Sequence, residues 1–350
     1  MLSRRGFVAG LSALAAPVPG WAAVGSPVAL SGARRPDGSF ALTGLRQDGS
    51  LAFTIPLPAR AHAGAAHPTR AEAVVIARRP GTFALVLDCA QGIVRRQLEA
   101  PEGRHFYGHA AFSEDGALLF TTENDYASGA GRIGVWDRRL GYARIDEFPS
   151  GGIGPHEIIR IGGGRLAVAN GGIRTHPKTG REKLNLDKMQ PNLTILRNSG
   201  SILQQVQPKA HQNSLRHIAA DRQGRIAVGF QWQGDPFDAP PLVALYEDGT
   251  LTDLTPDIEQ MRNLGAYIGS VSTHSAGIAV SAPRSGRVAL LGQNGTVIVS
   301  QHAPDICGLC RTTDQTLATD GNGRIYRLDD TGLTRLAEHP LAFDNHLVPL

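Results

Sequence analysis

Residues 109–124, His-Ala-Ala-Phe-Ser-Glu-Asp-Gly-Ala-Leu-Leu-Phe-Thr-Thr-Glu-Asn, contain the unit on which the fold depends. A histidine leads a short apolar strand, Glu-Asp-Gly supplies a turn, and a second apolar strand ends in polar residues. The unit recurs at three further histidines, and residues 346–350 match its first strand. The five leading histidines are His62, His109, His156, His217 and His346.

Two weaker copies without the histidine begin near Ser270 and Gly308. The period, roughly 40–60 residues with several short strands per copy, is typical of propellers and related arrays. The six internal copies span residues 62–108, 109–155, 156–216, 217–269, 270–307 and 308–345.

Residues 28–57 hold three strand-like runs but lack a His-led first strand, which residues 346–350 supply. One blade built from both termini closes a ring and leaves no sheet edge open. The sequence therefore predicts an all-β fold, a single seven-bladed β-propeller over residues 23–350. The alternative, a β-sandwich, does not explain the seven-fold recurrence.

The N-terminus, Ser3-Arg4-Arg5-Gly6-Phe7 followed by an apolar run, is typical of a twin-arginine export signal. Gly20-Trp21-Ala22 offers a small-x-small cleavage site, so we expect residues 1–22 to be a signal peptide. This predicts a periplasmic protein exported by the twin-arginine pathway. The alternative, a membrane anchor, is disfavoured because the apolar run is too short to span a bilayer comfortably. We expect no membrane span.

The chain has 350 residues and a net charge of +4, with its 35 Lys and Arg residues scattered rather than clustered. That distribution argues against a nucleic-acid partner, and we expect a monomer. Cys307-Gly-Leu-Cys310 has the spacing of a redox or metal pair, and Cys89 is the third cysteine. We interpret the three as ordinary buried thiols, with a local disulfide as the alternative.

The first strand of each propeller blade lies innermost, so a leading histidine should point toward the central axis near one mouth of the channel. Imidazole is the commonest transition-metal ligand. We therefore predict a metal site, for iron or copper, at His62, His109, His156, His217 and His346. The alternative is that these side chains bond neighbouring blades, with opposite blades too far apart to share one ion.

Polar residues at the ends of the second strands should reach the same mouth. We predict that they help to bind a ligand there: Glu123, Asn124, Asn170 and Trp232. Two long connections, residues 173–190 and 234–241, leave these strand ends and mark a binding face. Glu157 follows a leading histidine, where it could orient a neighbouring group or pair with Arg216, whereas by strand alternation alone it should face into the blade.

Four phrases, at residues 77–81, 109–116, 122–124 and 154–158, resemble an uncharacterised family of exported bacterial propellers, domain of unknown function 1513. Genes of that family commonly lie beside imelysin-type and di-haem peroxidase-like iron-uptake genes. The resemblance implies a periplasmic seven-bladed propeller connected with iron acquisition. It supplies no established catalytic residues.

Three functions follow from these features. The favoured hypothesis is a binding module for a metal ion, or for a metal-bearing ligand or partner. The second is an interaction scaffold for periplasmic iron-uptake proteins that uses the long connections. The third is a metal-dependent hydrolase or oxidoreductase in which the histidines and Glu123 activate a water. The sequence shows no set of nucleophile, base and orienting residue, so we lean against an enzyme.

Overall fold

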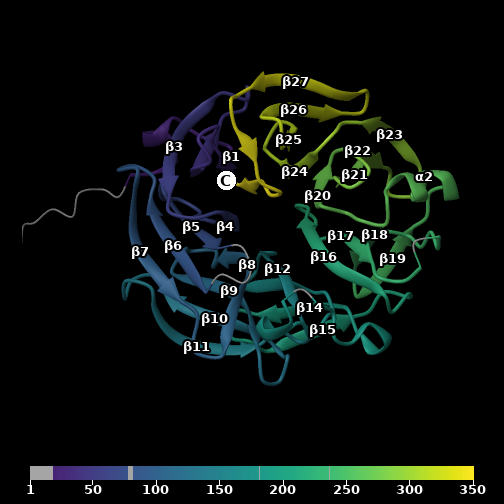
Figure 1. Ribbon diagram of the computed structural model, residues 1–350, viewed down its shortest axis with the longest axis horizontal. Helices are drawn as coiled ribbons and strands as arrows, with labels where there is room; N and C mark the ends of the chain where they lie inside the picture. Colours follow the sequence, from purple (N-terminus) through teal and green to yellow (C-terminus); the bar gives the residue numbers. More distant parts are fainter. Residues whose placement is uncertain (1–18, 78–81, 181, 236) are drawn as a thin grey trace, which may run out of the picture.

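The computed structural model describes residues 19–77, 82–180, 182–235 and 237–350. Seven antiparallel sheets follow one another around a central axis, with first strands near the axis and fourth strands at the rim (Figure 1). The seven-bladed β-propeller predicted from the sequence is confirmed. The twin-arginine motif and the apolar run after it lie outside the described residues.

The strands of blades 1 to 4, from the axis outward, are β28 (Ala342–Phe343) with β29 (Val348–Pro349), β1 (Ala29–Arg34), β2 (Phe40–Leu45) and β3 (Leu51–Leu57); β4 (Ala61–Ala66), β5 (Glu72–Ala77), β6 (Phe83–Asp88) and β7 (Ile93–Glu99); β8 (Arg104–Phe112), β9 (Leu118–Asp125), β10 (Gly131–Asp137) and β11 (Ala143–Pro149); and β12 (Pro155–Arg160), β13 (Arg165–Asn170), β14 (Asn192–Arg197) and β15 (Ile202–Val206).

The strands of blades 5 to 7 are β16 (Asn213–Ala220), β17 (Ile226–Trp232), β18 (Val243–Glu247) and β19 (Thr250–Leu254); β20 (Ser270–His274), β21 (Gly277–Ala282), β22 (Arg287–Leu291) and β23 (Val297–His302); and β24 (Ile306–Arg311), β25 (Thr316–Asp320), β26 (Arg324–Asp329) and β27 (Gly332–Glu338). The helical elements described are η1 (Trp21–Val24), η2 (Pro177–Thr179), η3 (Leu186–Lys188) and α2 (Ile258–Asn263).

The core is divided among the interfaces between adjacent blades, where seven apolar clusters fill the seven junctions. Blades 2 and 3 meet, for example, through Val74, Phe106 and Trp136. Because side chains alternate along each strand, the middle strands bury residues against both neighbours, and the rim strands are largely exposed. Each blade is thus stabilised by its two neighbours, so closure of the ring matters to all of them.

The ring closes as predicted, with one blade built from both termini. β28 and β29 both pair with β1, through Ala33–Phe343 and Leu30–Val348 among other pairs. The guanidinium of Arg60 donates two hydrogen bonds to the buried Asp344 carboxylate, at 2.7 and 2.9 Å. This bidentate pair fastens the C-terminal strand to the segment that enters blade 2.

The first described residues pack onto the propeller. The indole Nε1 of Trp21 donates to the carbonyl of His67 at 2.8 Å, and Ala71 N donates to the carbonyl of Pro19. The cleavage boundary at residue 22 remains a prediction, and it lies inside η1.

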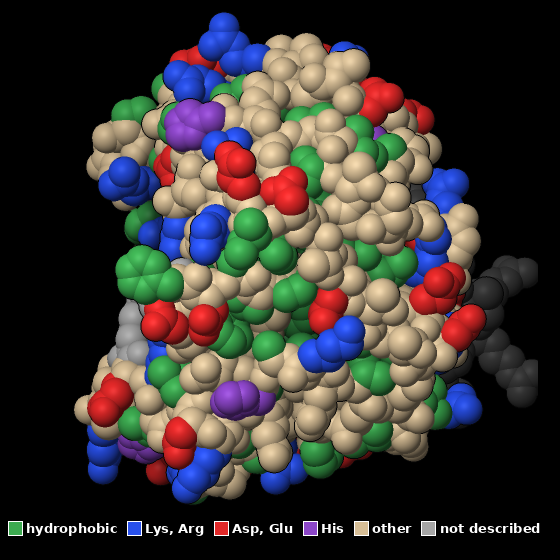
Figure 2. Space-filling view, turned by 90° about the vertical axis from the view of Figure 1, so that its right-hand side faces the viewer, with side chains coloured by type: hydrophobic (Ala, Val, Ile, Leu, Met, Phe, Trp, Pro, Cys, Tyr) green, Lys and Arg blue, Asp and Glu red, His purple; other side chains and the backbone are tan. Residues whose placement is uncertain are grey.

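The outer edge of the ring, on the side of α2, carries interspersed acidic and basic side chains (Figure 2). Among the described residues, no helix has the length and apolar character that a bilayer crossing requires.

Candidate metal centre

Irregular strand pairing presents all five leading histidines to the axis. In four innermost strands the register shifts at or beside the histidine, between residues 61 and 63, 106 and 110, 155 and 157, and 215 and 217. His346 lies within residues 344–347, between β28 and β29, opposite only Ser31 and Gly32. Extra residues in one strand re-aim the side chains there. β24 has a similar shift at residues 307–308, where the sequence supplies no histidine.

Gly108 shows how tightly this region is packed. It has a φ of +108°, in the region that favours glycine, within the irregular part of β8. A Cβ at this position would lie 2.2 Å from Cδ2 of His62. The backbone of blade 3 therefore lies so close to the imidazole of His62 in blade 2 that only glycine fits at position 108.

The five imidazoles form one cluster that spans the axis. Neighbouring ring centres lie close together, for example 5.2 Å between His62 and His109 and 4.9 Å between His156 and His217. His346 closes the set, at 4.7 Å from His62 and from His109 and at 5.0 Å from His217. Histidines of non-adjacent blades thus meet, because their side chains extend into the channel.

Burial keeps three of these imidazoles, those of His109, His156 and His217, uncharged. It lowers the pKa of His109 and of His156 well below the ordinary value, and neighbouring imidazoles add to the effect. Burial, with the nearby Arg216, lowers the pKa of His217 to about 3. At neutral pH these side chains are neutral imidazoles, the form that ligates metals.

Glu157 adds a carboxylate to the cluster, which strand alternation did not predict. Its Oε1 lies 3.6 Å from Nδ1 of His109, and its Oε2 lies 3.3 Å from Nδ1 of His217 and accepts from Ile218 N at 3.0 Å. The register shift in β12 breaks the alternation, so Glu157 faces the channel rather than the blade. Burial raises the pKa of the Glu157 carboxyl to about 7.

Two sets of three histidines have the spacing of a metal site, His62–His109–His156 and His109–His217–His346. In each set one nitrogen per ring lies within 4.8 Å of the others. Ligands on a tetrahedral ion with bonds of 2.0–2.1 Å are separated by about 3.3 Å, so small side-chain shifts would complete either site. Nε2 of His109 is buried without a hydrogen-bond partner among the described residues. A buried nitrogen in that state fits a metal ligand.

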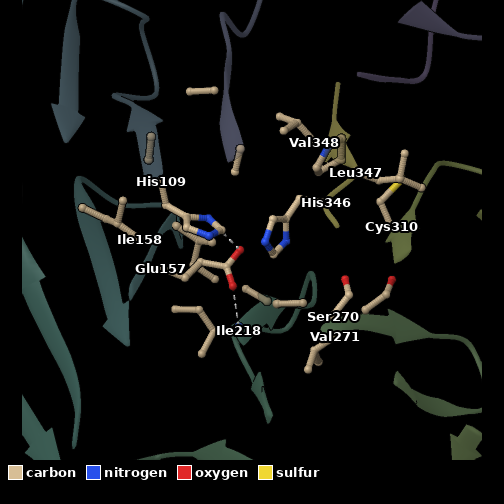
Figure 3. Close-up of a pocket in the computed structure, with 18 of the residues that line it drawn as sticks. His109, Glu157, Ile158, Ile218, Ser270, Val271, Cys310, His346, Leu347 and Val348 are labelled. Atoms are coloured by element: carbon tan, nitrogen blue, oxygen red, sulfur yellow. Dashed lines mark hydrogen bonds and ion pairs between the residues drawn. The ribbon is translucent and has the colours of Figure 1, made fainter. Parts of the chain in front are cut away.

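Two cavities flank the cluster along the axis. The first, of about 290 Å³, lies among the innermost strands and is walled by small residues such as Ala110 and Ala219. His109, Glu157 and His346 point toward one another at its edge (Figure 3). The second, of about 330 Å³, contacts His62 and His156 together with Lys183 of the long connection at residues 173–190 and Trp232 at the end of β17, and we call it the outer mouth. The cluster therefore separates two spaces within the channel.

The structure does not gather the four predicted ligand-binding residues into one site. The carboxylate of Glu123 is fully buried in ion pairs with Arg144, at 2.6 Å, and with Arg104. Asn170 donates to Asn192 and Thr194 of its own blade, and to the carbonyl of Ser150 in the segment that joins blades 3 and 4. These two residues therefore stabilise blades, and we leave them out of the site.

The remaining two lie toward the long connections. Asn124 donates to the carbonyl of Thr175, in the connection between β13 and β14. Trp232 lines the outer mouth, and its indole donates to the carbonyl of Asp235. Only Trp232 contacts the same cavity as the histidines. The three cysteines are buried and free, which agrees with their interpretation as ordinary thiols.

Seven blades and a histidine-lined axis define the class of this protein, a seven-bladed β-propeller with a candidate metal centre in its channel. A family profile described as "Protein of unknown function (DUF1513)" matches residues 55–350. The chain belongs to this family.

No curated protein matches the chain in sequence. Among solved structures, it resembles a chain of "Crystal Structure of Mitotic Checkpoint Complex", with a TM-score of 0.58 and 11% identity over 80% of this chain and 77% of that one. It also resembles the computationally designed Ika8 protein, with a TM-score of 0.51 and 14% identity over 89% of this chain and 84% of that one. At these identities the likeness concerns the fold alone.

Proposed function

We propose that this propeller binds one transition-metal ion, iron or copper, in its channel through His109, His217 and His346. The observation that carries the proposal is the convergence of three buried histidines from blades 3, 5 and 1, within 4.8 Å by one nitrogen each. Nε2 of His109 is buried without a hydrogen-bond partner among the described residues, and a metal ion would supply one.

Glu157 supports this set over the other one. The Glu157 carboxylate lies 3.3 Å from Nδ1 of His217 and 3.6 Å from Nδ1 of His109, so it would favour a ring proton on Nδ1 and leave Nε2 of each ring to the ion. Carboxylate–histidine–metal arrangements of this kind orient the ring and raise the basicity of the ligand. An ion at the cluster would in turn favour the ionised form of Glu157. The His62–His156 side then faces the outer mouth.

The test is a metal titration of protein stripped with a chelator, with ferrous iron, cupric copper and zinc followed by calorimetry. We expect one ion per chain, and at least a tenfold loss of affinity in His109→Gln and in His346→Gln. His302→Gln, the same change at an exposed histidine of β23, is the control and should bind as wild type. If His109→Gln and His302→Gln bind the ion equally well, the proposal is wrong.

Export and iron acquisition belong to the same proposal, and they rest on the sequence. The twin-arginine motif supports a periplasmic location, and the family resemblance supports a connection with iron uptake. Cell fractionation tests the first point. The wild-type chain should appear in the periplasm, whereas Arg4→Lys/Arg5→Lys should remain in the cytoplasm. Equal export of the two chains would contradict it.

A further inference from the structure

The outer mouth has a chemical character of its own. Its floor is formed by His62 and His156, which belong to the metal cluster, and its aromatic walls by Trp232 and Tyr267. A cavity of about 330 Å³ admits a small molecule of a few carbon atoms rather than a polymer. Because the floor is the cluster itself, a molecule in the mouth lies directly against the imidazoles.

Three cations surround this cavity, Lys183, Arg216 and Arg284, and none of the described residues that line it is acidic. They come from three separate places in the fold, namely the connection between β13 and β14, strand β16, and the turn after β21. Burial lowers the pKa of Lys183, and the charges of Arg216 and Arg284 lower it further. The three positive charges are therefore close enough to repel one another.

The surroundings hold two of these cations in place. Lys183 Nζ donates to Oε1 of Gln233 at 2.6 Å, which ties the connection at residues 173–190 to the end of β17 beside the mouth. The guanidinium of Arg284 lies 4.0 Å from the ring centre of Tyr267, a cation–π contact. Mutual repulsion between fixed cations is relieved when an anion binds among them.

The other cavity along the axis differs in charge. It contains the carboxylate of Glu157, two arginines at its rim, Arg160 and Arg311, and many small apolar residues between them. An anion is therefore drawn to the outer mouth, whose lining holds cations and no described acid.

We infer that the outer mouth binds a small organic anion with two or three carboxylate groups, which lies over His62 and His156. Three cations on separate elements match several spaced carboxylates better than one compact phosphate. The aromatic walls offer contact to a carbon skeleton. The role of this anion rests on the proposed function, because its negative charge would lie beside the histidine cluster and offset the charge of a metal ion held there.

Calorimetry with citrate as the probe tests the inference on chelator-stripped protein, so that binding does not depend on a metal. The test variant is Lys183→Gln/Arg284→Gln, which alters two exposed residues outside the core. The matched control is Arg311→Gln, an arginine at the rim of the other cavity. Circular dichroism confirms that each variant is folded, and Lys183→Gln alone, in an exposed connection, provides a milder version of the test.

We expect citrate to bind the wild-type and Arg311→Gln proteins alike, and the double variant at least roughly tenfold more weakly. We also expect orthophosphate to compete only at higher concentration than citrate. Equal citrate binding in the double variant and the control overturns the inference, and so does tighter binding of orthophosphate. The metal titration of the double variant separates the two proposals, since it should still take up one ion whether or not the mouth binds citrate.

Discussion

Glu157→Gln separates the role of the carboxylate from that of the fold. The glutamine has nearly the same shape, and its Oε1 can keep the bond from Ile218 N, which is 3.0 Å long in the wild type. Its amide group would then face an imidazole as a donor. The ring proton of that histidine would move to Nε2 and block the nitrogen that we assign to the metal.

The structure sets the size of the effect. Two of the three proposed ligands, His109 and His217, lie 3.6 and 3.3 Å from the Glu157 carboxylate. Loss of such an orienting partner costs about 10- to 100-fold in metal affinity, or about 1.4–2.7 kcal/mol. Competition with a chelator of known affinity measures it, with Glu102→Gln, an exposed glutamate in a turn, as the control.

The same change should stabilise the protein when no metal is present. The folded pKa of Glu157 is about 7, above its ordinary 4.5, so the folded state favours the neutral carboxyl. The free energy of unfolding is therefore lowered by the ionised carboxylate as the pH rises from 4.5 through 7. Replacing it with neutral Gln should raise stability at pH 8 by up to about 3 kcal/mol in urea denaturation. Unchanged metal affinity, or a loss of stability at pH 8, would refute the assigned role.

Three further predictions concern the fold around the cluster. Gly108→Ala places a Cβ 2.2 Å from the His62 ring, so it should lower the free energy of unfolding in urea by about 1–3 kcal/mol and weaken metal binding. The control is Gly103→Ala, which also has a positive φ but has open space around it, and it should leave metal affinity unchanged. The pKa of His67 falls to about 4 through burial, below the 6.5 of the unfolded chain, so stability should drop as the pH falls from 6.5 toward 4, by up to about 1.4 kcal/mol per unit. His67→Gln should reduce that slope in urea titrations at several pH values, while the buried histidines of the cluster keep the rest of it. An unchanged slope would contradict the assignment. Asp344→Asn breaks the ion pair with Arg60 at the closure of the ring. It should lower the free energy of unfolding by only about 1 kcal/mol, because the Arg60 side chain is half-exposed. Equal midpoints of urea unfolding in the variant and the wild type would show that the pair contributes nothing.

The repeat made most of the fold predictable from sequence. The His-led copies located the innermost strands, and the match of residues 346–350 to a first strand predicted closure by both termini. Glu157 was assigned to the wrong face because alternation holds only in regular pairing, and the bulge in β12 leaves no mark in the sequence. Glu123 was picked as a polar strand end, but the arginines that neutralise it come from strands whose register only the structure shows.

The outer mouth was only partly visible from sequence. Lys183, in the long connection at residues 173–190, and Trp232 both line the outer mouth, so these two features of the sequence pointed to one cavity. Lys183, Arg216 and Arg284 are separated by many residues along the chain, and the charged residues around them follow no pattern. Only the ring of blades brings these cations together, so their convergence could not be inferred before the fold was known.

A crystal structure of the metal-loaded protein, with anomalous scattering measured at the absorption edge of the bound metal, tests the central claim most directly. The account predicts one anomalous peak on the axis, about 2.1 Å from a nitrogen of each of His109, His217 and His346, with Glu157 beside the rings. A peak on the outer surface of the blades, or a cluster without a peak in crystals grown with excess iron or copper, would contradict it.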